Sequence, residues 1–296
     1  MNFNFKSFAT RLWEKINDDD ILGNAAQVAF YFSFALFPLL LFLISLIGII
    51  ISNKTELQDQ LFTILGEVMP KSAFDLVRTT LTEVTSNATG GKLTIGVLIT
   101  LWSASAGIDN MRGTLNEVYN LKETRSWFRT KLVSLLLTMG LGVLILITLG
   151  LIVYGSQTLD AILPIDSPYI LMALEWLLVI CLLLLAFAFL YNFAPNHEPF
   201  QWKWITPGAV VGVILWILFS FGFRLYLRYF DTYAATYGSL GAMIILLLWL
   251  YLTALVILIG GAINAILDEK TGIKKEAKDP EQVKEEATGS GKEAKT

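Results

Sequence analysis

The residues of this sequence that could do chemistry are polar side chains placed within or beside long apolar segments. Four of them, Gln27, Ser103, Asp109 and Asn264, would lie at similar depth if the segments alternate in direction across a membrane. Because polar groups in apolar surroundings need partners, we expect these four to form one polar pocket. Asp109 would be its only formal charge and could bind a cation or couple to protons. In the alternative interpretation, Asp109 is solvated just beyond the second apolar segment.

Five further polar residues are secondary candidates for the same kind of role: Asn24, Ser105, Asn192, Glu175 and Arg224. The first three are expected in the same half of the bundle as the pocket. Glu175 and Arg224 are expected near the opposite surface, where they could form an ion pair. Their neighbours Trp176 and Tyr226 are equally typical of residues at a membrane interface. For the small and hydroxyl residues, ordinary helix–helix contact is the alternative interpretation.

The sequence lacks the usual signatures of catalytic and metal sites. The single histidine, His197, cannot form a histidine metal cluster. The single cysteine, Cys181, cannot form an internal disulfide. No CxxC, GxxxxGK[ST] or GxSxG motif occurs. The net charge of −3 gives no broad basic groove for RNA. We therefore expect no enzyme activity, no metal, no cofactor and no nucleic-acid partner.

Six apolar segments must position these residues, and they indicate an integral membrane protein. Hydrophobic residues make up 55% of the chain and charged residues 16%, against about 25% charged in soluble domains. A bilayer core about 30 Å thick needs about 20 apolar residues in a helix, and only the second segment is shorter than that. The sequence predicts an all-α polytopic membrane protein with six transmembrane helices: Ala25–Ile51, Leu93–Gly107, Leu132–Tyr154, Tyr169–Phe193, Ile205–Leu225 and Ser239–Leu267.

Three segments flank or interrupt the transmembrane domain, which we place at 21–268. Residues 1–20 carry apolar residues at helical spacing with basic residues between them, which predicts an amphipathic interfacial arm or a helix packed against the bundle. Residues 53–92 predict two amphipathic helices outside the cytoplasm, acting as a lid or as a docking surface. Residues 269–296 are rich in lysine, glutamate, glycine and serine, so we expect a disordered cytoplasmic tail.

The placement of basic residues sets the predicted orientation. Five of them, Arg112, Lys122, Arg125, Arg129 and Lys131, follow the second segment, whereas the connection after the third segment has none. Because positive charge favours the cytoplasmic side, we expect both termini and the polar pocket to face the cytoplasm. The first apolar segment is too long for the core of a signal peptide, so we expect it to remain as a span.

Small residues in the sixth segment predict close helix crossings at Gly238, Gly241, Gly260 and Gly261. The run Tyr237–Gly241 could also form a tight re-entry or a helix start that faces a ligand. In the first segment, Pro38 removes one backbone hydrogen bond and predicts a kink.

Several groups of residues carry a resemblance to a known family. They are Asn24–Leu40, Leu101–Gly107 with Leu115–Tyr119, Pro207–Ala209, Tyr237–Gly241 with Leu248–Tyr251, and Gly260–Ala265. Together they resemble the YihY/BrkB family over most of the chain before the tail. The resemblance implies a six-span protein of the bacterial inner membrane, whose relatives carry virulence, serum-resistance or ribonuclease labels. The family usually has an acidic residue where Ile263 stands, so no role for that carboxylate carries over.

Two functions from different classes are compatible with this sequence, and a third is remote. We favour a transporter or lipid-translocating protein of the cell envelope, which predicts a cavity that reaches the midplane and is lined by Gln27, Ser103 and Asn264. The alternative is a non-transporting scaffold for envelope assembly, which predicts a dry bundle and a contact surface at 53–92. The remote alternative is a membrane-bound nuclease. The expected partners are membrane lipids, a small-molecule or lipid substrate, and envelope proteins.

Overall fold

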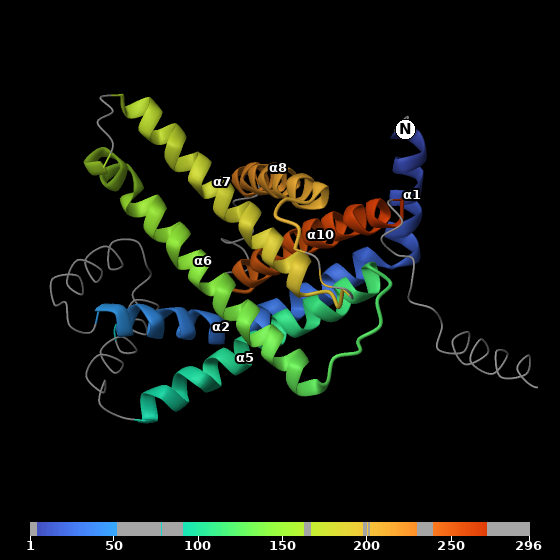
Figure 1. Ribbon diagram of the computed structural model, residues 1–296. Coiled ribbons are helices and arrows are strands. Elements are labelled where there is room, and N and C mark those ends of the chain that lie inside the picture. The colour runs from blue at the N-terminus through green and yellow to red at the C-terminus, as the bar shows by residue number, and fades with distance from the viewer. Residues whose placement is uncertain are drawn as a thin grey trace, which may run out of the picture.

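The computed structural model describes residues 5–51, 78, 91–162, 167–197, 200, 202–229 and 239–270. Within these ranges the regular structure is helical throughout, and Figure 1 shows the elements in chain order. They are α1 (Phe5–Asp18), α2 (Ile21–Ile51), α5 (Gly91–Val118), α6 (Trp127–Ile162), α7 (Pro168–Phe193), α8 (Pro207–Tyr229) and α10 (Ser239–Lys270). The predicted all-α fold is confirmed.

Four of the described helices are long and apolar enough to cross a membrane: Trp127–Ile152, Tyr169–Phe193, Pro207–Leu227 and Met243–Glu269. α2 becomes a fifth span if its two parts, Ile21–Leu36 and Pro38–Ile44, count as one despite a bend of 44° between them. The bend lies where Pro38 predicts a kink.

The predicted count of six spans is not reached among the described residues, because α5 is not one of the helices that are long and apolar enough to cross a membrane. It is a continuous helix of 28 residues where the sequence predicts the short second span. Serine, threonine and glycine interrupt its first half, and Asp109, Arg112 and Glu117 occupy its second half. α5 nevertheless runs antiparallel to α2. A hydrogen bond of 3.4 Å joins Asn24 near the start of α2 to Glu117 near the end of α5.

The arm before the bundle is helical. α1 packs the side chains of Leu12 and Ile16 against the hydrophobic core, while Trp13 is 67% exposed. Asp20, with φ of 43°, separates α1 from α2 and accepts a hydrogen bond of 3.3 Å from the Gly23 N–H in the first turn of α2. The predicted segment 53–92 lies outside the described residues except for Arg78 and the start of α5. The predicted tail lies outside them from 271, and α10 continues through 269–270.

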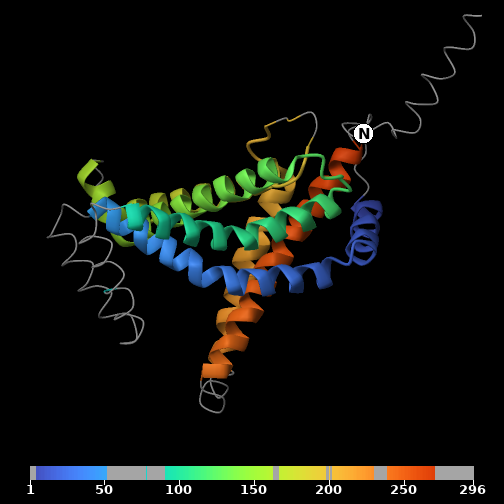
Figure 2. The ribbon, with the colours of Figure 1, turned by 90° about the horizontal axis from the view of Figure 1, so that it is seen from below.

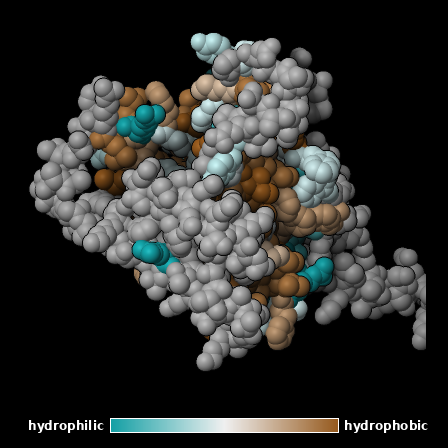
Figure 3. Space-filling view, turned by 90° about the vertical axis from the view of Figure 1, so that its left-hand side faces the viewer, coloured by the Kyte–Doolittle hydropathy of each residue, from teal (hydrophilic) through white to brown (hydrophobic). Residues whose placement is uncertain are grey.

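Six of the described helices form three neighbouring pairs. α2 lies alongside α5 and α6 lies alongside α7 (Figure 1), and the pair α8 and α10 crosses them in Figure 2. Large apolar side chains such as Phe30, Leu98 and Phe221 are more than half exposed, as expected where helices face lipid. Hydrophobic residues also dominate the described part of the face in Figure 3.

Glycines allow α8 and α10 to approach each other closely. A Cβ on Gly208 of α8 would overlap the carbonyl oxygen of Gly260 of α10. A Cβ on Gly260 would lie 2.7 Å from the carbonyl oxygen of Gly208, and one on Gly261 would lie 3.0 Å from Leu115 of α5. Gly238 lies outside the described residues, and the surroundings of Gly241 are not described. Backbone contact between α8 and α10 therefore fixes their crossing.

Candidate functional site

A polar pocket of about 160 Å³ lies at one end of the bundle, where α7, α8 and α10 meet. Its walls come from the end of α5, the end of α7, the connection before α8, and the last two turns of α10. The lining residues are Tyr119, Tyr191, Asn192, His197, Lys203, Ile205, Thr206, Pro207, Asn264, Leu267 and Asp268.

The floor of the pocket is the start of α8, held by a side chain of α10. Asn264 Oδ1 accepts a hydrogen bond of 2.8 Å from the Gly208 N–H, and Asn264 Nδ2 donates one of 2.9 Å to Thr206 Oγ1. Thr206 Oγ1 in turn accepts a hydrogen bond of 3.1 Å from the Ala209 N–H, as an N-cap residue does. Pro207 follows at the first helical position, where its missing N–H leaves no donor unsatisfied.

One wall is the connection from α7 to α8, which Asn192 holds in place. Asn192 Nδ2 donates to the carbonyl oxygens of Ala188 and Lys203, and Asn192 Oδ1 accepts from the Lys203 N–H, each at 2.8 Å. The side chain of Lys203 then reaches Asp268 of α10 at 2.6 Å. The two charged side chains remain 35% and 25% exposed, so the ion pair lies at the mouth of the pocket.

The inner wall is aromatic and neutral. The Tyr191 hydroxyl donates a hydrogen bond of 2.8 Å to the Ile257 carbonyl of α10. His197 meets the Tyr119 ring edge-on, at 4.9 Å between ring centroids. Burial raises the pKa of Tyr119, and burial lowers the pKa of His197 despite the nearby charge of Asp268. Both groups are therefore neutral near pH 7, and the charges at the pocket are those of Lys203 and Asp268.

A second polar cluster surrounds Asp109. Lys131 of α6 donates a hydrogen bond of 2.6 Å to Asp109 Oδ2 and one of 2.7 Å to Ser105 Oγ, both on α5. The same ammonium group lies 4.5 Å from the centroid of the Trp102 ring, which adds a cation–π contact. Lys131 therefore supplies a countercharge to Asp109, and this ion pair joins α5 to α6.

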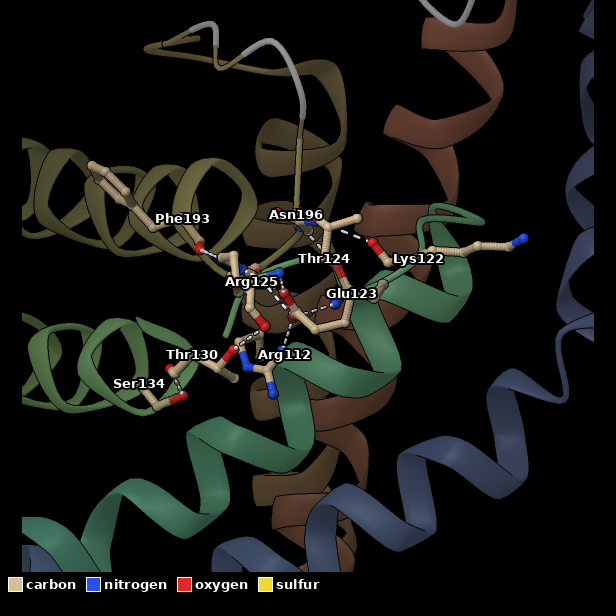
Figure 4. A network of polar contacts seen from close by, with 11 residues as sticks. Arg112, Lys122, Glu123, Thr124, Arg125, Thr130, Ser134, Phe193 and Asn196 are labelled. Carbon is tan, nitrogen blue, oxygen red and sulfur yellow. Dashed lines mark hydrogen bonds and ion pairs between the residues drawn. The ribbon is translucent and has the colours of Figure 1, made fainter. Parts of the chain in front are cut away.

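A third polar cluster ties the connection between α5 and α6 to the end of α7 (Figure 4). Glu123 forms ion pairs with Arg112 and, at 2.7 Å, with Arg125. Arg125 also donates to the carbonyl oxygens of Phe193 and Ala194 at 3.4 and 3.1 Å, which satisfies the C-terminal end of α7. Burial opposes ionisation of Glu123, but the hydrogen bonds from Arg125 and the charge of Arg112 outweigh it, so the pKa of Glu123 is lowered.

Two asparagines complete this third cluster. Asn116 donates to Glu123 at 3.1 Å and accepts from the Asn196 N–H at 2.7 Å. Asn120, with φ of 50°, ends α5 in the left-handed conformation. Its own N–H bonds to Glu117 and the next N–H bonds to the Asn116 carbonyl, which is the Schellman pattern. The turn therefore returns the chain so that Glu123 meets Arg112 and Asn116 of α5.

The structure separates the four residues that the sequence places in one pocket. Asn264 lines the pocket described above, and Asp109 belongs to the second cluster. The side chains of Gln27 on α2 and Ser103 on α5 are exposed. The predicted four-residue pocket is therefore not formed, because Gln27 and Ser103 lie on outer faces of their helices.

The secondary candidates have varied surroundings. Asn192 lines the pocket, and Ser105 is fully buried against Lys131. Asn24 donates a hydrogen bond of 2.9 Å to the Asp19 carbonyl. Glu175 packs close to Gly155 of α6, whereas Arg224 is exposed, and these two residues do not form an ion pair. Glu175 is partly buried and Trp176 is exposed, and the interfacial interpretation of Glu175 stays a prediction.

Sequence reasoning proposed two of the eleven lining residues, Asn192 and Asn264, and missed the other nine, among them Tyr119, His197, Lys203 and Asp268. Two signals were present. His197 is the single histidine, and Lys203 is the only basic residue in its short connection. Neither signal identified a partner, because the partner of Lys203 lies 65 residues later on another helix.

The sequence profile of the family described as Virulence factor BrkB matches residues 12–286. The ribonuclease-like protein YfkH of Bacillus subtilis (strain 168) is 32% identical over 89% of this chain and 96% of its own length. UPF0761 membrane proteins of Vibrio vulnificus (strain YJ016) and Vibrio campbellii (strain ATCC BAA-1116) are 28% and 30% identical, each over 89% of this chain and 83% of its own length. No solved structure matches the chain.

Proposed function

Since the chain belongs to the virulence factor BrkB family of membrane proteins, we propose that it moves a small polar molecule, or a lipid by its headgroup, across the membrane. The observation that carries this proposal is the polar pocket at one end of an otherwise apolar helical bundle. Ionisable groups inside membrane spans are costly, and they often mark the route of a substrate. Asp268, near the end of the apolar helix α10, is such a group, and it borders the pocket together with Lys203 of the neighbouring connection.

The pocket also has a defined inner end, which a transport cycle could open. The Tyr191–Ile257 hydrogen bond and the backbone contact of Gly208 with Gly260 close it toward the middle of α10. A transporter with this pocket would have access from one side in this state, and it would require a second state in which α8 and α10 separate. Such a movement has to break the hydrogen bonds of Asn264 with Gly208 and Thr206, which hold the start of α8 against α10.

The orientation forms part of the proposal. Three polar contacts, Asn24 with Glu117, Arg125 with Ala194 and Lys203 with Asp268, gather the start of α2, the connections after α5 and α7, and the end of α10 at the same end of the bundle. Positive residues are concentrated in these segments, so we assign this end and both termini to the cytoplasm of a bacterial inner membrane.

Reconstitution of the full chain into liposomes tests the proposal. We expect movement of fluorescent phospholipids between leaflets, or uptake of a labelled polar solute, above that of protein-free liposomes. The variant Lys203→Gln should reduce the rate at least tenfold. Lys122→Gln removes a lysine whose side chain is exposed outside the pocket, and it should leave the rate unchanged. Activity equal to protein-free liposomes for both lipid and solute would exclude transport.

A scaffold without transport activity is the second candidate, and the close packing of α8 against α10 favours it. The further cavity beside Trp216 and Trp249 measures only about 10 Å³, which is too small to continue a passage. A scaffold would keep the crossing closed. A thiol-reactive cross-linker that joins cysteines introduced at Trp216 and Thr253, whose side chains are hydrogen-bonded between α8 and α10, should then leave cellular function intact, whereas it should block a transporter.

We do not extend the ribonuclease-like name of the Bacillus subtilis relative to this chain. Among the described residues, no three histidine, cysteine, aspartate or glutamate side chains are grouped to hold a metal ion. The single histidine packs against Tyr119 in the pocket. We propose a non-enzymatic role, and RNA degradation by the purified chain would contradict it.

A further inference from the structure

We infer that the pocket receives a zwitterionic group, in which an ammonium and a phosphate or carboxylate lie a few bonds apart. The inference rests on the proposed function for the pocket being a substrate site, and it adds the chemical class of the substrate. The feature that carries it is the ion pair of Lys203 with Asp268 at the mouth of a pocket that is otherwise neutral.

Most hydrogen-bonding groups of the pocket are already used by the protein. Asn192 bonds to the Lys203 backbone, Asn264 bonds to Gly208 and Thr206, and the Tyr191 hydroxyl bonds to the Ile257 carbonyl. These groups shape the pocket, but they offer little to a ligand. An ammonium group has three N–H donors, and Lys203 gives one of them to Asp268. An ionised carboxylate can accept several hydrogen bonds. The ion pair is therefore the part of the pocket that can bind a ligand most strongly.

The equal and opposite charges decide the class of ligand. A simple anion that took Lys203 would leave Asp268 half-buried without its countercharge, and a simple cation that took Asp268 would do the same to Lys203. A zwitterion avoids both penalties. Its anionic group can bind Lys203 while its ammonium binds Asp268, so one ion pair becomes two and the net charge of the site stays at zero.

The remaining lining agrees with a short stem between the two charges. Ile205, Pro207 and Leu267 give apolar contact, and the neutral Tyr119 and His197 add no charge that would favour one sign. A volume of about 160 Å³ is below that of pockets for drug-sized ligands, which begin near 300 Å³. The pocket therefore fits a headgroup or a small free zwitterion, and acyl chains of a lipid would have to remain outside it.

Calorimetric titration of the purified full chain in a nonionic detergent tests the inference with defined probes. Glycerophosphoethanolamine carries both charges, glycerophosphoglycerol carries only the anion, and ethanolamine carries only the cation. We expect the first to bind at least tenfold more tightly than either of the others. A short-chain phosphatidylethanolamine, compared with glycerophosphoethanolamine and with β-alanine, distinguishes a lipid headgroup from a free zwitterion as the source.

Variants locate the binding at the ion pair. The double variant Lys203→Met with Asp268→Asn removes both charges with little change of shape, and it should weaken glycerophosphoethanolamine at least tenfold. Lys122→Gln should bind like the parent chain. Because the double variant could fold poorly, its thermal unfolding is measured alongside, and the comparison of the three probes on the parent chain stands without it.

The outcomes separate this inference from the proposed function. Equal affinity for glycerophosphoglycerol and glycerophosphoethanolamine, or no binding of any zwitterion, would overturn the zwitterion site even if liposomes show transport. Tight and selective binding of a zwitterion without transport would support the site and overturn the transporter.

Discussion

Asn264 Oδ1 accepts a 2.8 Å hydrogen bond from the Gly208 N–H, so a buried side chain of α10 satisfies the first turn of α8. The same amide donates to Thr206 Oγ1 at 2.9 Å, and Asn264 is only 4% exposed. The pocket floor, the cap of α8 and the α8–α10 crossing therefore depend on one amide group.

The variant Asn264→Ala should destabilise the protein by about 2 kcal/mol, because it leaves a buried backbone donor without its acceptor. Thermal unfolding in detergent, followed by circular dichroism, measures the loss. Asn264→Asp keeps the acceptor for Gly208, so it should recover part of the stability. Equal losses in the two variants would show that the hydrogen bond to Gly208 contributes little.

The glycines of α10 and α5 give a matched pair for a packing test. Gly260→Ala should cost several kcal/mol, about the upper range for overpacking, because the new methyl would overlap the Tyr191 hydroxyl and the Gly208 backbone. Gly113→Ala meets nothing within 4 Å and should be neutral or stabilising by up to about 1 kcal/mol. Unfolding temperatures of the two variants report the difference. If Gly260→Ala is as stable as the parent, the crossing of α8 and α10 is looser than described.

The predicted elements and the predicted site differ in how well the sequence specifies them. Long apolar runs in the sequence predict α6, α7 and α10, because the thickness of the bilayer core sets how many apolar residues a spanning helix needs. Those helices are apolar on nearly every face, so their sequences do not indicate which face turns inward. The rotation of α7 decides that Asn192 enters the pocket, and the rotation of α2 decides that Gln27 does not.

The partners in the site were harder to predict than the residues themselves. Asp109 stands out as a charge after an apolar segment, but its partner Lys131 belongs to a connection where basic residues are expected for topology alone. The same holds for Lys203 and Asp268, which are 65 residues apart in the chain. Pairs of this kind are set by helix tilt and register, which cannot be read from the apolar pattern of helices that are hydrophobic on nearly every face.

Asp109 and Lys131 should behave as one unit. Asp109→Asn and Lys131→Gln should each destabilise by about 1 kcal/mol, because the pair is partly exposed and each variant leaves one charge without its partner. The double variant should cost less than the sum of the two, with a coupling of about 0.5 kcal/mol or more. Chemical or thermal unfolding of the four proteins completes the cycle. Strict additivity would show that the ion pair contributes nothing to stability.

The Glu123 cluster should make stability depend on pH in the acid range. The folded state lowers the pKa of Glu123 below 4.5, so its contribution is complete above that value and is lost as the pH falls through the lowered pKa. Arg125→Ala removes the main hydrogen-bond donor, so this variant should be less stable at pH 7 and should lose less stability between pH 5 and pH 3, by roughly 1 kcal/mol. Unfolding temperatures across this range measure both effects. Parallel pH profiles for parent and variant would contradict the assignment.

The final prediction concerns which side of the membrane carries the pocket. Ser126 is exposed in the connection between α5 and α6, close to the Glu123 cluster and at the same end of the bundle as Lys203. Asn87 lies outside the described residues, in the segment that the sequence places on the opposite side. In a Cys181→Ala background, Asn87→Cys should react with an impermeant maleimide in intact cells. Ser126→Cys should react only after the inner membrane is opened, because five basic residues hold its connection in the cytoplasm. The reverse pattern would place the pocket outside the cell, and labelling of both cysteines in intact cells would show that α5 does not separate the two sites.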